Sequence, residues 1–136
     1  MTAAIAALAV AALSACSSPQ SPAQIASTGS VTINGTNVNT PIIRCSQLEW
    51  FRTIEIGGQQ SGATAVIDQR AEPITAQSVR IYNLGGFTGM YSQHDGGKAD
   101  ASLNGDTFTI KGSAEGYKTD KPGEPATADF KITAKC

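Results

Sequence analysis

The stretch SVRIYNLGGFTGMYSQ, residues 78–93, decides the fold. Before its glycine pair, Val79 and Ile81 share one face, and Asn83 is a third candidate for that face. The same alternation assigns Leu84 to the opposite face. A period of two predicts a β-strand, and the alternation resumes after the glycines. The stretch therefore predicts two antiparallel strands joined by a tight glycine turn.

Two Asn-Gly pairs mark further hairpins on either side of this stretch. Asn34-Gly35 interrupts SVTINGTNV (30–38), and Asn104-Gly105 separates KADASL from DTFTIKGSAEGY. Asn and Gly both tolerate the positive φ that the central residues of a type I′ turn require. Each pair therefore predicts a two-residue turn between antiparallel strands.

The rest of the chain supplies more short strands. Ile54 and Ile56 alternate with polar neighbours and are expected to face inward. A helix is possible only over CSQLEWF (45–51), and KTDKPGEPA (118–126) is expected to be a loop because of its prolines. With turns every 8–12 residues, the predicted fold is all-β: an antiparallel β-sandwich or curved sheet of about eight or nine short strands.

Composition excludes some classes of partner. Charged residues make up 15% of the chain and the net charge is −1, so no field attracts nucleic acid. The first charged residue is Arg44. One histidine and the lack of a Cys-x-x-Cys spacing argue against zinc, and no sequence motif calls for a cofactor.

The N-terminal segment, residues 1–15, is apolar and Ala-rich, as in the central region of a secretory signal. It has no Lys or Arg before the apolar run, which indicates either an upstream start codon or a weak signal. A buried N-terminal helix is the alternative. Residues 16–30 follow as a Ser- and Pro-rich tether, which cannot bury enough surface to fold. The β domain is expected over 31–136.

The signal ends in LSAC (13–16), which has the pattern of a bacterial lipobox: Leu, two small residues, then Cys. Its cysteine thiol would take a diacylglycerol, and its α-amino group a further acyl chain after cleavage. Stable anchoring needs more than one chain, and this one residue can carry two or three. The sequence therefore predicts lipidation of Cys16. The alternative is a secreted protein cut near Ala15, with Cys16 as a free thiol.

If Cys16 is acylated, Cys45 and Cys136 are the only cysteines that remain. An exported compartment is oxidising, so a disulfide between them is expected to form. The alternative is two free, buried thiols.

Residues that could carry chemistry are few. His94 lies beside Asp95 in a glycine-rich turn, which is typical of a solvated turn residue rather than a catalytic base. No paired carboxylates or metal-ligand cluster accompany it, so no enzyme is predicted. Trp50-Phe51 is the one dense aromatic pair. It is expected in the core, with a ligand-binding groove as the alternative.

The order of these pieces resembles the mycobacterial lipoprotein antigen family of LpqH-like surface lipoproteins. The resemblance extends from the lipobox through the whole body. It is carried by LSAC (13–16), VTINGTNV (31–38), the Ile-Ile-x-Cys segment at 42–45, IEIGG (54–58), SVRIYNLGGFTGMY (78–91), GGKADASLNGDTFTIKGSAEG (96–116) and FKITAKC (130–136). SQLEWF (46–51) is bulkier than the corresponding stretch of the family.

The resemblance implies a lipoprotein antigen of the cell envelope, triacylated at Cys16 and held on the extracytoplasmic side of the membrane, with a disulfide between Cys45 and Cys136. It also implies that innate immune receptors of a host recognise the acylated N-terminus. It supplies no catalytic residue. The second hypothesis is a carrier of a lipid or small apolar ligand, which would need a cavity of several hundred Å³.

Overall fold

The computed structural model describes residues 24–25, 29–38, 42–95 and 97–136. The predicted signal, Cys16 and most of the predicted tether lie outside these residues. Within them the chain forms eleven strands, all paired antiparallel. They are β1 (Gln24–Ile25), β2 (Gly29–Ile33), β3 (Thr36–Val38), β4 (Ile43–Leu48), β5 (Phe51–Gly57), β6 (Gly62–Asp68), β7 (Thr75–Leu84), β8 (Phe87–Ser92), β9 (Ala99–Asn104), β10 (Thr107–Lys118) and β11 (Lys121–Lys135).

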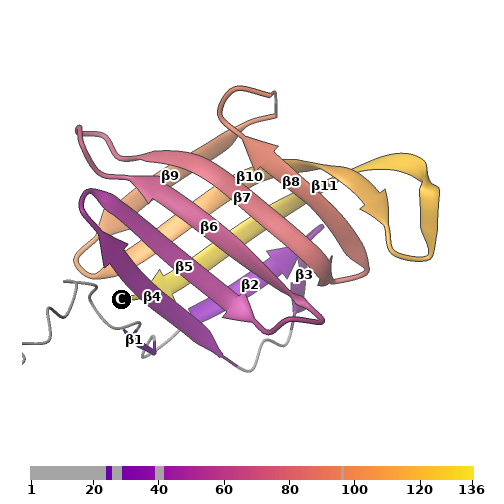
Figure 1. The fold of residues 1–136 in the computed structure, drawn as a ribbon, viewed down its shortest axis with the longest axis horizontal. Coiled ribbons are helices and arrows are strands. Elements are labelled where there is room, and N and C mark those ends of the chain that lie inside the picture. Colours follow the sequence, from indigo (N-terminus) through magenta and orange to yellow (C-terminus); the bar gives the residue numbers. More distant parts are fainter. Residues whose placement is uncertain (1–23, 26–28, 39–41, 96) are drawn as a thin grey trace, which may run out of the picture.

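The strands form one continuous sheet in the order β1-β4-β5-β6-β7-β8-β10-β11-β2-β3, with β9 added to β10. The sheet branches at β10, which pairs with β9 over residues 107–112 and with β8 over residues 115–118. Figure 1 shows the result: β4 to β8 form a front layer that crosses a back layer of β9, β10, β11 and β2. The predicted all-β fold is confirmed, as one sheet bent into two layers and left open.

Two predicted hairpins form at their Asn-Gly pairs, with one change. Asn34 and Gly35 have φ of 51° and 77°, as a type I′ turn requires, and β2 pairs with β3. At the other pair, Asn104 still belongs to β9 and is paired with Thr107, so the turn is centred one residue later. Gly105 alone has positive φ there, at 64°, in the first central position. That is the position at which a type II′ turn needs glycine.

The core lies between the two layers and is built from the inward-facing residues of both. Among the residues that the structure describes, no polar or charged side chain is fully buried. Ile54 and Ile56 are 0% and 3% exposed, which confirms their predicted inward direction. The largest fully buried side chains are Ile54, Ile67, Ile81, Ile110, Ile132, Val31, Val79 and Cys45.

The end of β7 departs from strict alternation. Asn83 is exposed and Leu84 is only 4% exposed, the reverse of the predicted faces. The register with β8 shifts between Ile81 and Leu84, and Asn83 has a positive φ of 44°. A residue in this conformation breaks the two-residue period, because it inserts an extra position into the strand. The backbone amide of Asn83 donates to Oγ1 of Thr88, at 2.9 Å, which holds the irregularity in place.

A helix that the sequence left possible does not form, and one predicted loop is wrong. The segment 45–51 contains no helix: β4 runs to Leu48 and turns through Glu49 and Trp50 into β5. The segment 118–126 is not a long loop, because β10 and β11 extend into it and pair around a two-residue turn. Figure 1 shows this hairpin projecting beyond the two layers. β2 pairs with β11 only over residues 130–134, which leaves room for prolines on the free edge of β11.

The disulfide between Cys45 and Cys136 is confirmed, with a Cα–Cα distance of 5.9 Å. Cys45 is 1% exposed, in the middle of β4, and Cys136 follows the end of β11. Figure 1 shows the C-terminus beside β4. The bond therefore joins the front layer to the back layer, and the alternative of two free thiols is wrong.

Candidate functional site

The fold does not gather the candidate residues of the sequence, such as His94 and the Trp50-Phe51 pair, into one site. His94 is exposed in the turn after β8, away from the buried face of the sheet. No described group of three or more His, Cys, Asp or Glu side chains could hold a metal ion. In the same part of the chain, no helix is long and apolar enough to cross a membrane. Cys16 lies outside the described residues.

Trp50 and Phe51 lie at the turn between β4 and β5, at one end of the front layer. Trp50 is 42% exposed and Phe51 is partly buried, so the prediction that the pair lies in the core is wrong for Trp50. The ring centroids are 5.9 Å apart, with the planes tilted by 52°. Leu48 is paired directly with Phe51 and is 60% exposed. The turn therefore presents three large apolar side chains together.

Arg70 completes this group from the segment after β6. Its guanidinium carbon lies 5.5 Å from the ring centroid of Trp50 and 5.6 Å from that of Phe51, within the range of a cation–π interaction. Arg70 also donates from Nε and Nη2 to the Asp68 carboxylate, at 3.0 Å and 2.5 Å to Oδ2. We call Leu48, Trp50, Phe51 and Arg70 the Trp50 cluster.

The contact between Arg70 and Asp68 shifts both pKa values. Hydrogen bonds from the Arg70 side chain and backbone lower the pKa of Asp68, because they stabilise the carboxylate. The same side-chain hydrogen bond raises the pKa of Arg70. Both groups are therefore charged at neutral pH, and the guanidinium is held in position over the two rings.

Arg52 lies on the opposite face of β5 from the Trp50 cluster. Its guanidinium carbon is 5.4 Å from the ring centroid of Phe108, on β10 in the back layer. Partial burial lowers the pKa of Arg52, because it removes water from the charged form. Its Nε is buried without a hydrogen-bond partner in the structure. Arg52 thus closes this end of the core and does not belong to an exposed site.

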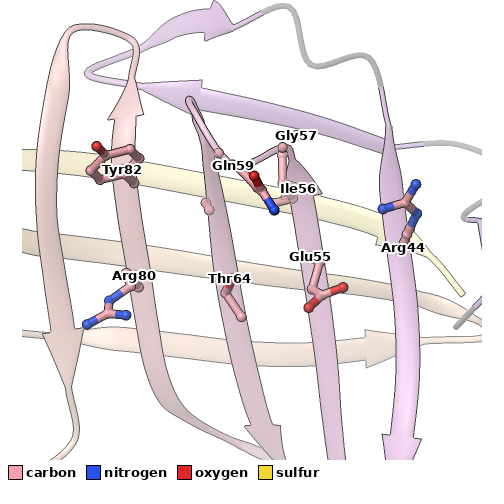
Figure 2. Close-up of a pocket in the computed structure, with 11 residues that line it drawn as sticks. Arg44, Glu55, Ile56, Gly57, Gln59, Thr64, Arg80 and Tyr82 are labelled. Carbon is pink, nitrogen blue, oxygen red and sulfur yellow. The ribbon is translucent and has the colours of Figure 1, made fainter.

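A row of polar side chains crosses the outer face of the front layer. Arg44 is paired with Glu55, Glu55 with Thr64, and Thr64 with Arg80, on four neighbouring strands. Figure 2 shows these four side chains in a line, with Tyr82 near one end. They line a depression of about 350 Å³. Alternating charges at paired positions stabilise a sheet, and the same groups can hydrogen-bond a polar ligand.

A second depression, of about 620 Å³, continues from the first over β7, β8 and β10. Tyr82 and Met90 are 52% and 46% exposed in it, and Tyr117 adds a third large side chain. Its lining includes Gly89 and Gly116, which are paired across β8 and β10. Both depressions lie on the outer face, whereas the space between the layers is filled by the core.

The sequence carried no motif for these surfaces. The polar row depends on the registers of three strand pairs, and its members lie far apart in the chain. The Trp50 cluster joins a turn to a segment about twenty residues later. Only the aromatic pair itself gave a signal, and the exposure of Trp50 follows from its place in the turn between β4 and β5.

Comparisons with known proteins identify a family and several relatives. The family model described as "Mycobacterium 19 kDa lipoprotein antigen" matches residues 22–136. A protein named "Putative lipoprotein" from Mycobacterium avium subsp. hominissuis (strain TH135) is 57% identical over 112 residues, which cover 82% of this chain and 78% of the relative. A protein named "Probable lipoprotein LppE" from Mycobacterium tuberculosis (strain ATCC 25618 / H37Rv) is 35% identical over 106 residues, 78% of this chain and 76% of the relative.

A third relative, lipoprotein LpqH of Mycobacterium avium, is 31% identical over 113 residues, which cover 82% of this chain and 70% of the relative. The family match spans the β domain and both disulfide cysteines rather than one local motif. The chain therefore belongs to the Mycobacterium 19 kDa lipoprotein antigen family.

Proposed function

We propose that this chain is a lipoprotein antigen of the cell envelope, held on the extracytoplasmic side of the membrane by acyl chains on Cys16. Its β domain would serve contacts with the envelope or a host and would carry out no catalysis. Membership of a lipoprotein antigen family is the observation that carries this proposal. The disulfide adds support, because such a bond persists in an oxidising, exported compartment.

The cysteine inventory supports the proposed assignment of the lipid to Cys16. Cys45 and Cys136 are joined to each other, so Cys16 is the remaining thiol of three. It stands at the end of LSAC (13–16), directly after the apolar segment. Each acyl methylene buried in the bilayer contributes about 0.8 kcal/mol, so two or three chains on one residue would anchor the protein stably.

The proposed organisation has three parts: residues 1–15 as the signal peptide, 16–30 as the lipidated cysteine and tether, and 31–136 as the β domain. The structure describes two pieces of sheet within the proposed tether, the short strand Gln24–Ile25 and the first residues of β2. The span outside the sheet between the lipid and the domain would accordingly be short.

The absence of catalysis is proposed from the distribution of reactive groups. His94 is an exposed turn residue, and the polar row of the front layer consists of cross-strand neighbours at a regular spacing. A general base needs a partner that orients it within hydrogen-bonding distance of the reacting group. These features are more typical of a binding or recognition surface than of an active site.

The anchor can be tested by expressing the full chain in a mycobacterial host and following its membrane fraction. Cys16→Ala removes the proposed acylation site, and the neighbouring Ser17→Ala serves as a matched control. After detergent phase separation of that fraction, we expect the wild type and Ser17→Ala in the detergent phase. Cys16→Ala should be found in the aqueous phase. Retention of Cys16→Ala with the membrane would show that something other than the lipid holds the protein.

Host recognition is proposed to depend on the acylated N-terminus and an innate immune receptor. Purified acylated chain should activate receptor-bearing reporter cells, and the Cys16→Ala chain should not. Equal activation by both forms would assign the response to the β domain instead.

A carrier of a lipid or small apolar ligand remains the second candidate, and one observation favours it. The depression of about 620 Å³ contains the exposed side chains of Tyr82 and Met90. It lies on the outer face of the sheet, so a ligand would be only partly enclosed. A saturable, Tyr82-dependent binding of a fluorescent fatty acid would support this function, and its absence would leave the envelope antigen alone.

A further inference from the structure

We propose that the Trp50 cluster is a second, non-covalent membrane contact, which rests in the headgroup region of the same bilayer that holds the acyl chains and so orients the β domain. The inference rests on the proposed function, because it needs a membrane anchor at Cys16. Its evidence is separate: the direction of β1, the exposure of the Trp50 cluster and the charges around it.

The direction of β1 places the anchor on the correct side of the domain. Gln24 is paired antiparallel with Cys45, and Ile25 with Arg44. The chain therefore enters β1 from the end at which β4 finishes and turns. Leu48 lies three residues beyond Cys45 along β4, a distance of about 10 Å. The turn that carries the Trp50 cluster is thus close to the point where the anchor segment meets the sheet.

The length of chain between the lipid and the sheet keeps this turn near the bilayer. Cys16 precedes Gln24 by eight residues. Even fully extended, eight residues span at most about 28 Å. The β domain is therefore confined close to the membrane, and the end of the front layer beside β1 is the end that faces it most readily.

The exposed side chains suit the boundary between headgroups and acyl chains. Leu48 and Trp50 are 60% and 42% exposed, and Phe51 is partly buried beside them. Tryptophan concentrates at membrane interfaces because its ring is apolar and its indole N–H can donate to a polar group. Leu48 and Phe51 flank it on paired strands. The turn can therefore insert as a small apolar wedge.

The charges favour a neutral interface over an acidic partner. Arg70 is paired with Asp68, and Glu49 is exposed within the turn itself. Arg52 points to the core side of the sheet, against Phe108. The exposed groups thus provide no excess positive charge to attract anionic lipid or acidic protein. Insertion would depend on burial of apolar surface, and it should change little with salt concentration.

The chain contains a single tryptophan, so its fluorescence reports directly on this turn. The experiment uses the full acylated chain in phosphatidylcholine vesicles, some of which carry bromine on the acyl chains near the headgroups. We expect the brominated lipid to remove roughly half or more of the Trp50 emission, with a shift of the emission to shorter wavelength, at low and at high salt. Leu48→Ser should weaken the quenching, because it removes the exposed flank of the wedge.

A matched control moves the reporter to the other end of the same layer. Trp50→Phe combined with Tyr82→Trp places the only tryptophan at position 82, beside Gly62 at the far end of β6. Emission from position 82 should be quenched little. Equal quenching at both positions would overturn the proposed orientation.

The remaining outcomes separate the inference from the proposed function. If the chain floats with the vesicles but Trp50 is not quenched, the membrane contact is wrong and the anchor stands. Shielding of Trp50 from acrylamide without quenching by brominated lipid would assign the turn to a protein partner or a second copy, and would also overturn the contact. If the acylated chain does not float with the vesicles, the anchor is wrong and the contact falls with it.

Discussion

Cys45 and Cys136, with Cα atoms 5.9 Å apart, join two layers that, over the described residues, are linked by strand pairing only between β8 and β10. Cys45 lies on β4, at the other end of the front layer from β8. The backbone amide of Cys136 also donates to the carbonyl oxygen of Asp106, at 2.9 Å, in the turn between β9 and β10. The open side of the sandwich is therefore closed covalently, which explains how an unclosed sheet can hold a packed core.

The disulfide should make a large contribution to stability. It closes a loop between residues 91 positions apart. On the chain-entropy model, reduction or the double substitution Cys45→Ala/Cys136→Ala should lower the free energy of unfolding by about 4–5 kcal/mol. Urea unfolding with and without reductant measures this, and the double variant should be insensitive to reductant. Identical unfolding curves for the oxidised and reduced wild type would contradict the account.

The branch of the sheet at β10 should depend on a glycine. A Cβ built on Gly116 would overlap the carbonyl oxygen of Thr88 and the Cα of Gly89, both backbone atoms of β8. Gly116→Ala should therefore force the two strands apart and cost about 2–3 kcal/mol of unfolding free energy.

The matched control for this prediction is Gly123→Ala, on the same β10–β11 hairpin. A Cβ at Gly123 would meet nothing within 4 Å. Its effect should stay within about 0.5 kcal/mol. Comparable losses for the two variants, measured by thermal or urea unfolding, would show that β8 and β10 do not approach each other as described.

The pair of Asp68 and Arg70 should be visible in an NMR titration. Hydrogen bonds from Arg70 lower the pKa of Asp68, so the pair stabilises the fold at a pH above the ordinary carboxyl pKa. That stability is lost as the pH falls through the lowered pKa of Asp68. Arg70→Gln should return the pKa of Asp68 toward its ordinary value. An unchanged Asp68 titration in that variant would show that the contact does not form in solution.

The Arg52 side chain should be dispensable for stability. Its Nε is buried without a partner, and its pKa is lowered by burial, so the charge gains little in the folded state. Replacement of such a group by an apolar side chain of similar length is often neutral or stabilising. Arg52→Met should therefore change the free energy of unfolding by less than about 1 kcal/mol, or increase it. A loss well above that would show that the guanidinium has a partner in solution, and exposed Arg80→Met provides the baseline.

Local patterns predicted the parts of the fold that depend on a few neighbouring residues. The turns at Asn34-Gly35 and at residues 85–86 were readable because their residues favour positive φ. Ile54 and Ile56 followed from alternation alone. The disulfide followed from counting cysteines once Cys16 was assigned to lipid.

Predictions failed where a turn carried no glycine signal or where a distant strand decided the outcome. Glu49 turns the chain with a positive φ of 53°, although Glu is rare in that conformation, so a tight turn at this position was not expected. Asn83 also has a positive φ, and it breaks the alternation within β7. The branch of the sheet at β10 depends on pairing between remote strands, as does the position of Arg70 over Trp50. Neither pairing leaves a pattern in the local sequence.

The intact mass of the protein extracted from its native membrane, before and after reduction, tests the central claim most directly. The account predicts a chain that begins at Cys16 and carries two or three acyl chains. Its mass should rise on reduction by the two hydrogens of one opened disulfide. A chain that retains residues 1–15, or that begins at Cys16 without acyl chains, would contradict the account.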